Sequence, residues 1–363
     1  MKAALFCTAR YMGDARQDVW PAPADTYSAE VAERSMQTTL DQFRLADEFG
    51  FDWVTVAEHH YSPFSLTPTP MLMAAALTQT VKRARIAVLG PTLPILNPIR
   101  VAEEFAMLDT MSGGRVIAGL LRGTPNEYVT YNINPSESRA RFEEAVELVR
   151  MAWTEPEPFG WQGRYYQYRS VSIWPRPAQA PHPPIYVSGS SPESGEYAAR
   201  NRFGLGLAFT TLPLAEKSVA HYRACAAKFG WEPTSEDIVY RIGVHVADTD
   251  DQAVADLSHG PRHVGLSMRN RAVESAVAES GFYGRDAADQ RNRLAPRDLK
   301  ERIELGQILV GSPETVLKQI RAIHAKVGNG VIDLPLATQL GEPTSRAIEL
   351  FGTKVLPRLR DLQ

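Results

Sequence analysis

Cysteine is scarce in this sequence. Only Cys7 and Cys225 occur among its 363 residues, and they lie far apart in the chain. A disulfide framework or a thiolate metal site needs several cysteines at close spacing, so neither is expected. The fold must therefore be held by its hydrophobic core, and a chain of this length can bury a large one.

An excess of charge of one sign is also missing. Lys and Arg number 39 and Asp and Glu number 42, which gives a net charge of −3. A nearly neutral chain gives no reason to expect nucleic acid or an anionic membrane as a partner. Apolar runs stay well below the ~18 residues that a membrane span needs, and residues 1–6 are too short an apolar stretch for a signal peptide. We expect a soluble, cytoplasmic protein.

Apolar segments of strand length alternate with segments of helical periodicity along most of the chain. Strands are predicted at 2–7, 51–57, 85–90, 116–121, 185–188, 205–209, 238–247 and 331–336. Helices are predicted at 30–50, 69–81, 97–111, 136–154, 191–201, 214–229, 312–327 and 343–360. Parallel strands need crossover connections, which these helices supply. The continuous run of such units predicts an α/β fold, a single-domain (β/α)8 TIM barrel over residues 1–363.

Two segments interrupt the alternation. Residues 159–183 are rich in aromatic residues and proline and are predicted to form a hairpin and an extended arm. Residues 258–300, between the seventh and eighth predicted strands, have no clean periodicity and contain Arg262, Arg269, Arg271, Arg285, Arg291, Arg293 and Arg297. This segment is either an exposed helical insertion with a solvated basic face or a mobile lid over an anionic ligand. Its position on the mouth side of the barrel favours the lid.

Three ionisable residues, Glu58, His59 and His60, directly follow the predicted strand at 51–57. In a (β/α)8 barrel the carboxyl ends of the strands carry the active site, whereas the opposite face serves stability. A single histidine near a strand end is more often structural, but two beside a glutamate at the mouth indicate acid–base chemistry. Metal binding is disfavoured, because adjacent side chains on a strand diverge and no second ligand cluster occurs.

Two further strand ends have features that suit an anion. Arg122 and Gly123 end the fourth strand, and the fifth strand runs into Ser188, Gly189 and Ser190 directly before a helix. Glycine lets the backbone approach a ligand, hydroxyls donate hydrogen bonds, and a helix N-terminus favours negative charge. An ordinary surface ion pair and a plain serine N-cap are the alternatives. Both features at one mouth favour a phosphorylated cofactor.

Longer stretches share their pattern with one known family. They are the run from Glu58 to Pro70 and the segments 94–104 (Pro-Ile-Leu-Asn-Pro-Ile-Arg-Val-Ala-Glu-Glu), 108–115 (Leu-Asp-Thr-Met-Ser-Gly-Gly-Arg), 136–154 and 183–191. Together they resemble the bacterial luciferase-like flavin-dependent monooxygenases. The resemblance covers about residues 2–245 and is thin over 258–300; it is specific for the family and says little about the substrate.

The resemblance implies a (β/α)8 barrel that binds reduced FMN at its mouth, with roles for individual residues. His59 matches the histidine that protonates or stabilises the flavin peroxide, and Glu58 and His60 flank it. Arg122, Gly189 and Ser190 match contacts to the FMN phosphate. The remaining implied positions are Leu89, Gly90, Thr124, Val187 and Ser188 for the cofactor and Phe6, Tyr61 and Phe64 for the substrate pocket. Relatives have a non-proline cis peptide where Leu89 and Gly90 stand, and Leu121 replaces the reactive cysteine of luciferase.

The function implied is that of an FMNH2-dependent two-component monooxygenase. A separate NAD(P)H:flavin reductase would deliver FMNH2, and O2 would form a flavin C4a-(hydro)peroxide that oxygenates a small apolar or aromatic substrate. The sequence has no Rossmann GxGxxG motif, which agrees with the use of NAD(P)H elsewhere. A homodimer is expected through helices near 70–81 and 98–111. Two alternatives stay open: an F420-dependent hydride-transfer enzyme of the same fold, and a non-catalytic flavin-binding protein.

Overall fold

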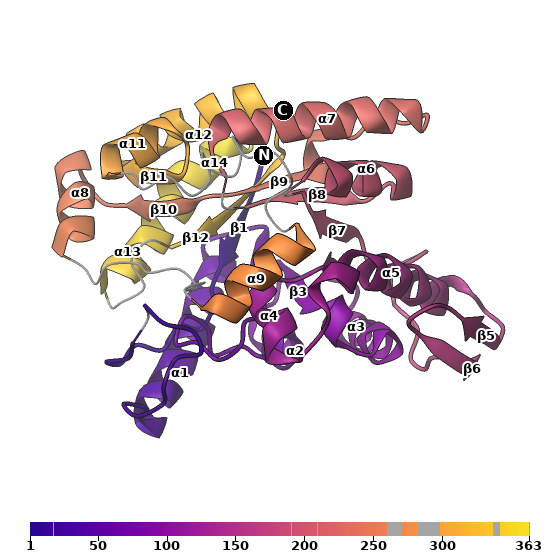
Figure 1. Cartoon of the computed structure of the whole chain (residues 1–363). Helices are drawn as coiled ribbons and strands as arrows, with labels where there is room; N and C mark the ends of the chain where they lie inside the picture. Colours follow the sequence, from indigo (N-terminus) through magenta and orange to yellow (C-terminus); the bar gives the residue numbers. More distant parts are fainter. Residues whose placement is uncertain are drawn as a thin grey trace.

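Figure 1 presents the computed structural model of the chain, which describes residues 1–16, 18–189, 191–208, 210–259, 270–281, 298–336 and 342–362. A closed barrel of parallel strands lies at its centre, in the order β1-β12-β9-β8-β7-β4-β3-β2. The barrel strands are β1 Lys2–Phe6, β2 Trp53–Val56, β3 Arg85–Thr92, β4 Val116–Leu121, β7 Ile185–Ser188, β8 Gly204–Leu207, β9 Ile238–Arg241 and β12 Val331–Pro335. The predicted (β/α)8 barrel is thus confirmed.

Helices surround the barrel and cover its outer face. They are α1 Ala29–Glu48, α2 Pro70–Thr80, α3 Pro98–Ser112, α5 Ser138–Thr154, α6 Pro192–Asn201, α7 Leu212–Lys228, α12 Pro313–Val327 and α13 Glu342–Leu350, which continues through a π-helical turn, Phe351–Val355, into α14 Leu356–Leu359. Their starts follow the expected chemistry: Asn97 caps α3 by accepting from the amides of Ile99 and Arg100. Each of these helices falls within a few residues of its predicted position.

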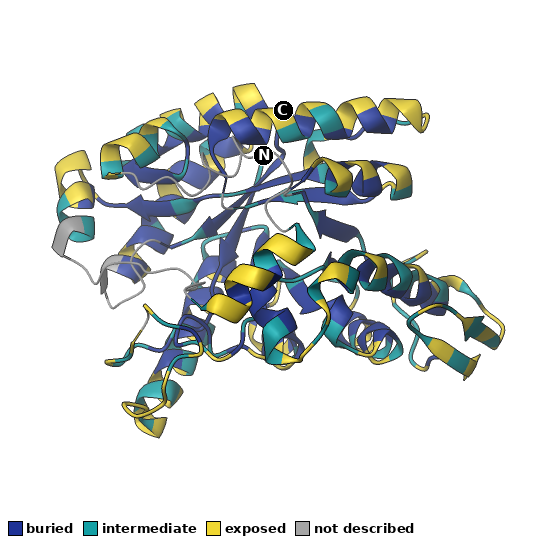
Figure 2. Ribbon diagram, viewed as in Figure 1, coloured by how far each residue is buried: buried dark blue, intermediate teal, exposed yellow. Residues whose placement is uncertain are grey.

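The hydrophobic core has an outer and an inner part. The outer part lies between strands and helices, and Figure 2 shows the strands buried while the outward faces of the helices are exposed. The inner part fills the barrel itself with Ala4, Trp53, Ala87, Ile117, Tyr186, Val239 and Val331. The rings of Trp53 and Tyr186 meet edge to face with centroids 5.6 Å apart. The interior of the barrel is therefore a packed core and not a pore.

The prediction of one barrel strand over 238–247 is wrong in its second half. Only β9 pairs within the barrel, because its register with β12 ends where Arg241 faces Asp333. The chain then continues as β10 Gly243–Val246 and pairs in parallel with β11 Ile308–Gly311 in a separate two-stranded sheet. Sequence reasoning missed β11, since four apolar residues beside an irregular segment give too weak a signal.

Three smaller features complete the chain. A hairpin of β5 Phe159–Gln162 and β6 Gln167–Val171 confirms the one predicted within 159–183. Between β10 and β11 lie α8 Asp250–His259, α9 Arg271–Ser280 and α11 Leu299–Glu304. The helix α9 lies against α4 Pro125–Thr130, a short helix after β4 that was not predicted. The predicted lid falls largely on 260–269 and 282–297, outside the described residues, so it stays a prediction.

Candidate active site at the mouth of the barrel

Glu58 and His60 form a buried pair just beyond the end of β2. The His60 Nε2 lies 3.2 Å from Glu58 Oε1, and Glu58 Oε2 accepts a hydrogen bond from the Thr92 amide at 3.3 Å. The His60 carbonyl in turn accepts from the indole of Trp20 at 2.9 Å. Both side chains are nearly inaccessible. This buried contact therefore supports, from the inside, the residues that form the mouth.

His59 points to a different partner. Its Nδ1 lies 3.1 Å from Oε1 of Glu127, and its side chain keeps 14 % exposure, more than those of Glu58 and His60. The ring packs edge-on against Phe64, with centroids 5.4 Å apart. Within the described residues, Nε2 has no hydrogen-bond partner. A carboxylate at Nδ1 fixes the imidazole with its N–H toward Glu127, so that Nε2 is the nitrogen available for proton exchange.

Glu127 was missed by sequence reasoning. It occupies the third position of α4, where Thr124 is the N-cap; its Oε2 accepts from the Thr124 amide at 3.1 Å and also from the Thr124 hydroxyl. Its side chain is 1 % exposed. Burial raises the pKa of this carboxyl, but hydrogen bonds from His59 and Thr124 outweigh burial and leave the pKa below its usual value. The pattern Thr124-Pro125-Asn126-Glu127 is a capping-box signal that could have revealed it.

Two arginines, Arg122 and Arg139, lie in a second part of the mouth. Arg122, just after β4, donates from Nη1 to the carbonyl of Ser280 at the end of α9, at 2.9 Å. Arg139 in the first turn of α5 donates to the hydroxyl of Ser191, the N-cap of α6, at 3.3 Å. Burial lowers the pKa of Arg139, and repulsion from the nearby Arg122 lowers it further. Sequence reasoning did not single out Arg139, because only the fold brings the start of α5 beside that of α6.

Close backbone packing accompanies these arginines. Gly189, after β7, donates its amide to the Gly206 carbonyl at 2.8 Å, and a Cβ on Gly189 would lie 2.5 Å from the Leu205 side chain. Val187 is buried and Ser188 is half-buried, whereas Ser190 lies outside the described residues. Only glycine fits at position 189, where the chain turns toward the N-terminus of α6.

The strand β3 bulges at its carboxyl end. Its register with β4 shifts between Leu89 and Thr92, and Gly90 has a φ of +135° that side chains rarely adopt. A Cβ there would lie 3.2 Å from the Glu58 amide. The expected cis peptide between Leu89 and Gly90 is wrong: the cis bonds in the described chain precede prolines 21, 175 and 181. The bulge and the positive φ turn the backbone here without a cis bond.

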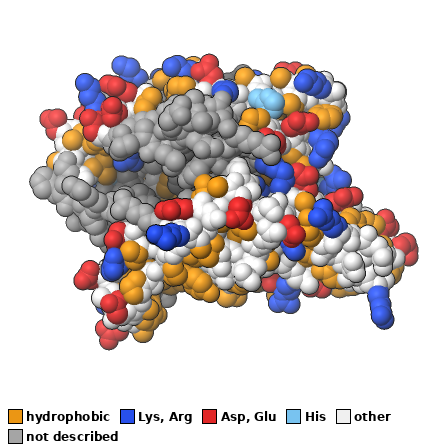
Figure 3. Space-filling view, viewed as in Figure 1, with side chains coloured by type: hydrophobic (Ala, Val, Ile, Leu, Met, Phe, Trp, Pro, Cys, Tyr) orange, Lys and Arg blue, Asp and Glu red, His pale blue; other side chains and the backbone are white. Residues whose placement is uncertain are grey.

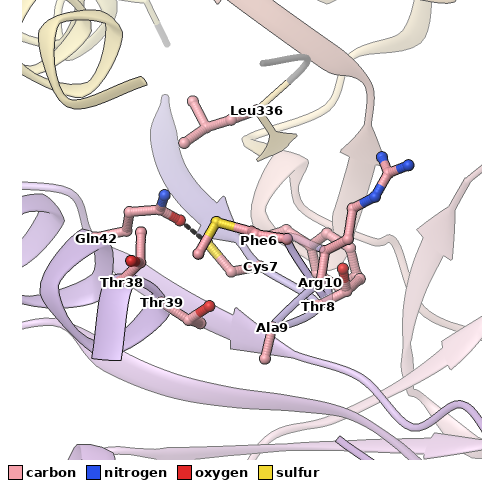
Figure 4. Close-up of a pocket in the computed structure, with 10 residues that line it drawn as sticks. Phe6, Cys7, Thr8, Ala9, Arg10, Thr38, Thr39, Gln42 and Leu336 are labelled. Atoms are coloured by element: carbon pink, nitrogen blue, oxygen red, sulfur yellow. Dashed lines mark hydrogen bonds between the residues drawn. The ribbon is translucent and has the colours of Figure 1, made fainter. Parts of the chain in front are cut away.

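The predicted pocket aromatics lie in three different environments. Phe6 is buried beneath the guanidinium of Arg241, Phe64 is buried against His59, and Tyr61 is exposed on a loop with a φ of 55°. Figure 4 shows a cavity beside Phe6, between β1 and α1, where Cys7 Sγ lies 3.4 Å from Gln42 Oε1. Its volume of about 10 Å³ suits a single water molecule. A cofactor does not fit there.

Neither an acidic nor a basic field dominates this side of the molecule. In Figure 3 the acidic and basic side chains of the described surface are intermixed. Of the arginines in the predicted lid, Arg271 lies within the described residues and is exposed on α9. The described residues contain no group of three or more side chains that could hold a metal ion. No helix in the described part of the chain is both long and apolar enough to cross a bilayer.

A parallel barrel with acid–base pairs and arginines at the carboxyl ends of its strands defines the architecture of a TIM-barrel enzyme. The family model described as luciferase-like monooxygenase matches residues 14–329, and the chain belongs to this family. The crystal structure of the monooxygenase RslO1 from Streptomyces bottropensis has a TM-score of 0.77 and 27 % identity, over 99 % of both chains.

Individual relatives differ in the cofactor that their names state. The chain is 26 % identical over 357 residues to FMNH2-dependent dimethylsulfone monooxygenase of Pseudomonas putida, covering 95 % of this chain and 90 % of that one. It is 26 % identical over 366 residues to F420-dependent glucose-6-phosphate dehydrogenase of Intrasporangium calvum, covering 94 % and 98 %. The oxygenase component of flavin-dependent trigonelline monooxygenase of Acinetobacter baylyi is 29 % identical over 221 residues, with 59 % of this chain and only 60 % of that relative covered.

Proposed function

We propose that this protein is the oxygenase component of an FMNH2-dependent monooxygenase that inserts one oxygen atom of O2 into a small organic substrate. The observation that carries the proposal is the contact of His59 with Glu127 at 3.1 Å, at a mouth that also holds two arginines. An imidazole oriented by a buried carboxylate is equipped to exchange a proton. The family membership and the names of the relatives support the same activity.

The residues at the mouth fit FMN. We assign the phosphate of FMN to Arg122, Arg139 and the N-terminus of α6, which Gly189 precedes without a side chain. We assign the contact with the flavin ring to the apolar residues Leu89, Gly90 and Leu121 beside the bulge of β3. The Leu121 side chain would lie 3.7 Å from a Cβ on Gly90. When bound, reduced FMN supplies the electrons that activate O2.

The protein's own side chains provide protons, orientation and exclusion of water. We assign to His59 the exchange of a proton at Nε2, and to Glu127 the orientation of the ring from Nδ1. Glu58 and His60 support the wall behind His59 through their own contact. Thr124 acts through Glu127, because its amide and hydroxyl both donate to that carboxylate. We assign to the buried rings of Phe64 and Phe6 the contact with an apolar or aromatic substrate.

An anaerobic titration tests the proposal. The protein should bind FMNH2 more tightly than oxidised FMN, and NADH alone should not reduce the bound flavin, since a separate NAD(P)H:flavin reductase delivers FMNH2. Addition of O2 with reductase and NADH should then yield oxygenated product from a substrate panel. Tight stoichiometric binding of oxidised FMN together with direct reduction by NADH would identify a self-contained flavoenzyme instead.

F420-dependent hydride transfer is the second candidate, because the full-length similarity to an F420-dependent dehydrogenase favours it. The two cofactors have different absorption spectra, so titration with each, followed by the spectrum of the loaded protein, separates the two functions. Binding of F420 in place of FMNH2, with hydride transfer and no consumption of O2, would replace the monooxygenase proposal.

We also propose a homodimer formed through α2 and α3. Leu72 on α2 is 73 % exposed, and Met107 and Met111 on α3 are exposed as well. Large apolar side chains gathered on two adjacent helices suit burial against a second copy.

A further inference from the structure

A charged pair lies inside the barrel near the mouth. Arg241 ends β9, and Asp333 is its register partner on β12. The Nε of Arg241 donates to Asp333 Oδ2 at 2.7 Å, and the hydroxyl of Thr55 on β2 donates to Asp333 Oδ1 at 3.0 Å. Asp333 and Thr55 are fully buried. The carboxylate therefore holds the guanidinium by its Nε side and is itself fixed by a third strand.

The rest of the guanidinium has a different environment. Phe6 of β1 covers one face, with its ring centroid 3.6 Å from Arg241 Cζ. The two terminal nitrogens, Nη1 and Nη2, have no hydrogen-bond partner among the described residues. The Arg241 side chain keeps 14 % exposure while its neighbours Phe6, Thr55 and Asp333 are buried. The donors of the guanidinium that remain for a ligand are thus those of the Nη edge, which form a fixed planar fork.

This edge is suited to one kind of ligand. Asp333 already balances the positive charge of Arg241. The Nη groups therefore recognise a ligand mainly by the geometry of their hydrogen bonds, because two parallel N–H donors match the two oxygens of a planar carboxylate. A phosphate has separate anchors in Arg122, Arg139 and the start of α6. The ring of Phe6 beside the guanidinium makes the immediate surroundings of this edge apolar.

We propose that Arg241 is a specificity-determining residue that binds the carboxylate of the substrate. The substrate class is then a small carboxylic acid with an apolar or aromatic body, whose acid group lies against the Nη edge and whose body packs beside Phe6. This inference rests on the proposed oxygenase function, because it names the substrate class of the same mouth. The ring carbonyls of the flavin are the competing acceptors for these donors.

Matched acids and esters test the assignment. Benzoate, phenylacetate and 3-phenylpropionate, each beside its methyl ester, are titrated calorimetrically into the protein with and without FMN. At least one acid should bind about tenfold or more tightly than its ester, the ratio that ~1.4 kcal/mol of charge-assisted hydrogen bonding provides. Arg241→Gln should remove this preference and leave FMNH2 affinity unchanged. Absence of acid preference in every pair, or its persistence in R241Q, overturns the proposal.

Further variants keep the test decisive. R241Q leaves Asp333 buried without its cation, which destabilises a fold, so the double variant R241Q/D333N, with two neutral amides, is titrated beside it. Arg346→Gln breaks an Arg–Asp pair of the same 2.7 Å length on the surface, with Asp248, and should keep the acid preference. Loss of FMNH2 affinity with retained acid preference would assign Arg241 to the flavin and overturn the proposal. Failure of the oxygenase function shows separately, as absence of FMNH2 binding by the unaltered protein.

Discussion

Replacement of Glu127 by glutamine tests the contact on which the proposed chemistry depends. Glu127 Oε1 meets His59 Nδ1 at 3.1 Å while Oε2 accepts from Thr124, so both carboxylate oxygens are used. Glutamine also serves in a capping box, and α4 should remain folded with the amide oxygen toward Thr124. The amide NH2 of the glutamine then faces His59 Nδ1. When the imidazole is protonated on both nitrogens, the Nδ1–H would point at this NH2, so that two donors face each other without an acceptor.

The expected loss follows from that clash. A hydrogen bond to a charged group contributes ~1.5–3 kcal/mol, and removal of a positioned acid–base group typically costs about 10²–10⁴ in rate. Because His59 itself remains, product formation by Glu127→Gln should fall about 10- to 150-fold, the rate equivalent of ~1.5–3 kcal/mol, while FMNH2 affinity stays unchanged and oxygen consumption ends in hydrogen peroxide. Product per O2 consumed is the assay, and ¹⁵N NMR of His59 should show the proton moved to Nε2. Normal coupling of oxygen to product in E127Q would refute the role of Glu127.

The same carboxylate gives a pH dependence of stability. The pKa of Glu127 in the folded protein lies below its usual value of 4.5. A group with a lowered folded-state pKa stabilises the protein above its unfolded-state pKa, and this contribution is lost as pH falls through the folded-state pKa. The stability difference between the unaltered protein and E127Q, measured by urea unfolding, should therefore shrink on acidification below about pH 4.5. A stability difference that increases as the pH falls would contradict the expected direction of this pH dependence.

The remaining predictions concern the other parts of the proposed function. His59→Ala should retain FMNH2 binding, lose about 10²–10⁴ of product formation and release hydrogen peroxide in stopped-flow experiments; normal coupling would transfer the role to a neighbouring residue. Arg122→Ala should weaken FMN binding by about 2–3 kcal/mol and leave riboflavin, which lacks the phosphate, unaffected; equal losses would place Arg122 elsewhere. Light scattering should give a dimer, and Leu72→Asp with Met107→Asp should give a folded monomer. Protease should cleave the 258–300 segment more slowly when reduced flavin and substrate are bound than in their absence. Equal cleavage rates in the two states would contradict the prediction that this segment is a lid.

Sequence patterns were sufficient for most of the barrel because most of its strands are compact apolar runs next to helices whose starts are marked by capping residues. The Asn97-Pro98 pair, for example, marks the start of α3 through an N-cap and a proline at the first position. The prediction of one continuous strand at 238–247 failed because the residues on both sides of Arg241 are similarly hydrophobic. Only pairing distinguishes β9 from β10, and pairing depends on residues far away in the chain.

The candidate site could be predicted only in part. The run from Glu58 to His60 was visible in sequence, but the partners of its side chains were not. Local spacing suggested one cluster, whereas the structure separates His60, held by Glu58, from His59, held by Glu127. The signal for Glu127 was present as a capping box, and an arginine in the apolar stretch of β9 was the signal for Arg241. Neither could be assigned a role until the fold brought distant strands together.

The aromatic filling of the barrel interior has a consequence for traffic through the protein. Trp53 and Tyr186 occupy the interior, and the Tyr186 hydroxyl donates to the Glu236 carbonyl at the amino end of the barrel, at 3.0 Å. Passage along the barrel axis is therefore closed, and a ligand of the mouth enters and leaves at the carboxyl ends of the strands. Cofactor and substrate then obey a last-in, first-out order wherever one lies above the other. Under the proposed function, a product that leaves slowly would delay the exchange of the cofactor, and product release would then limit turnover.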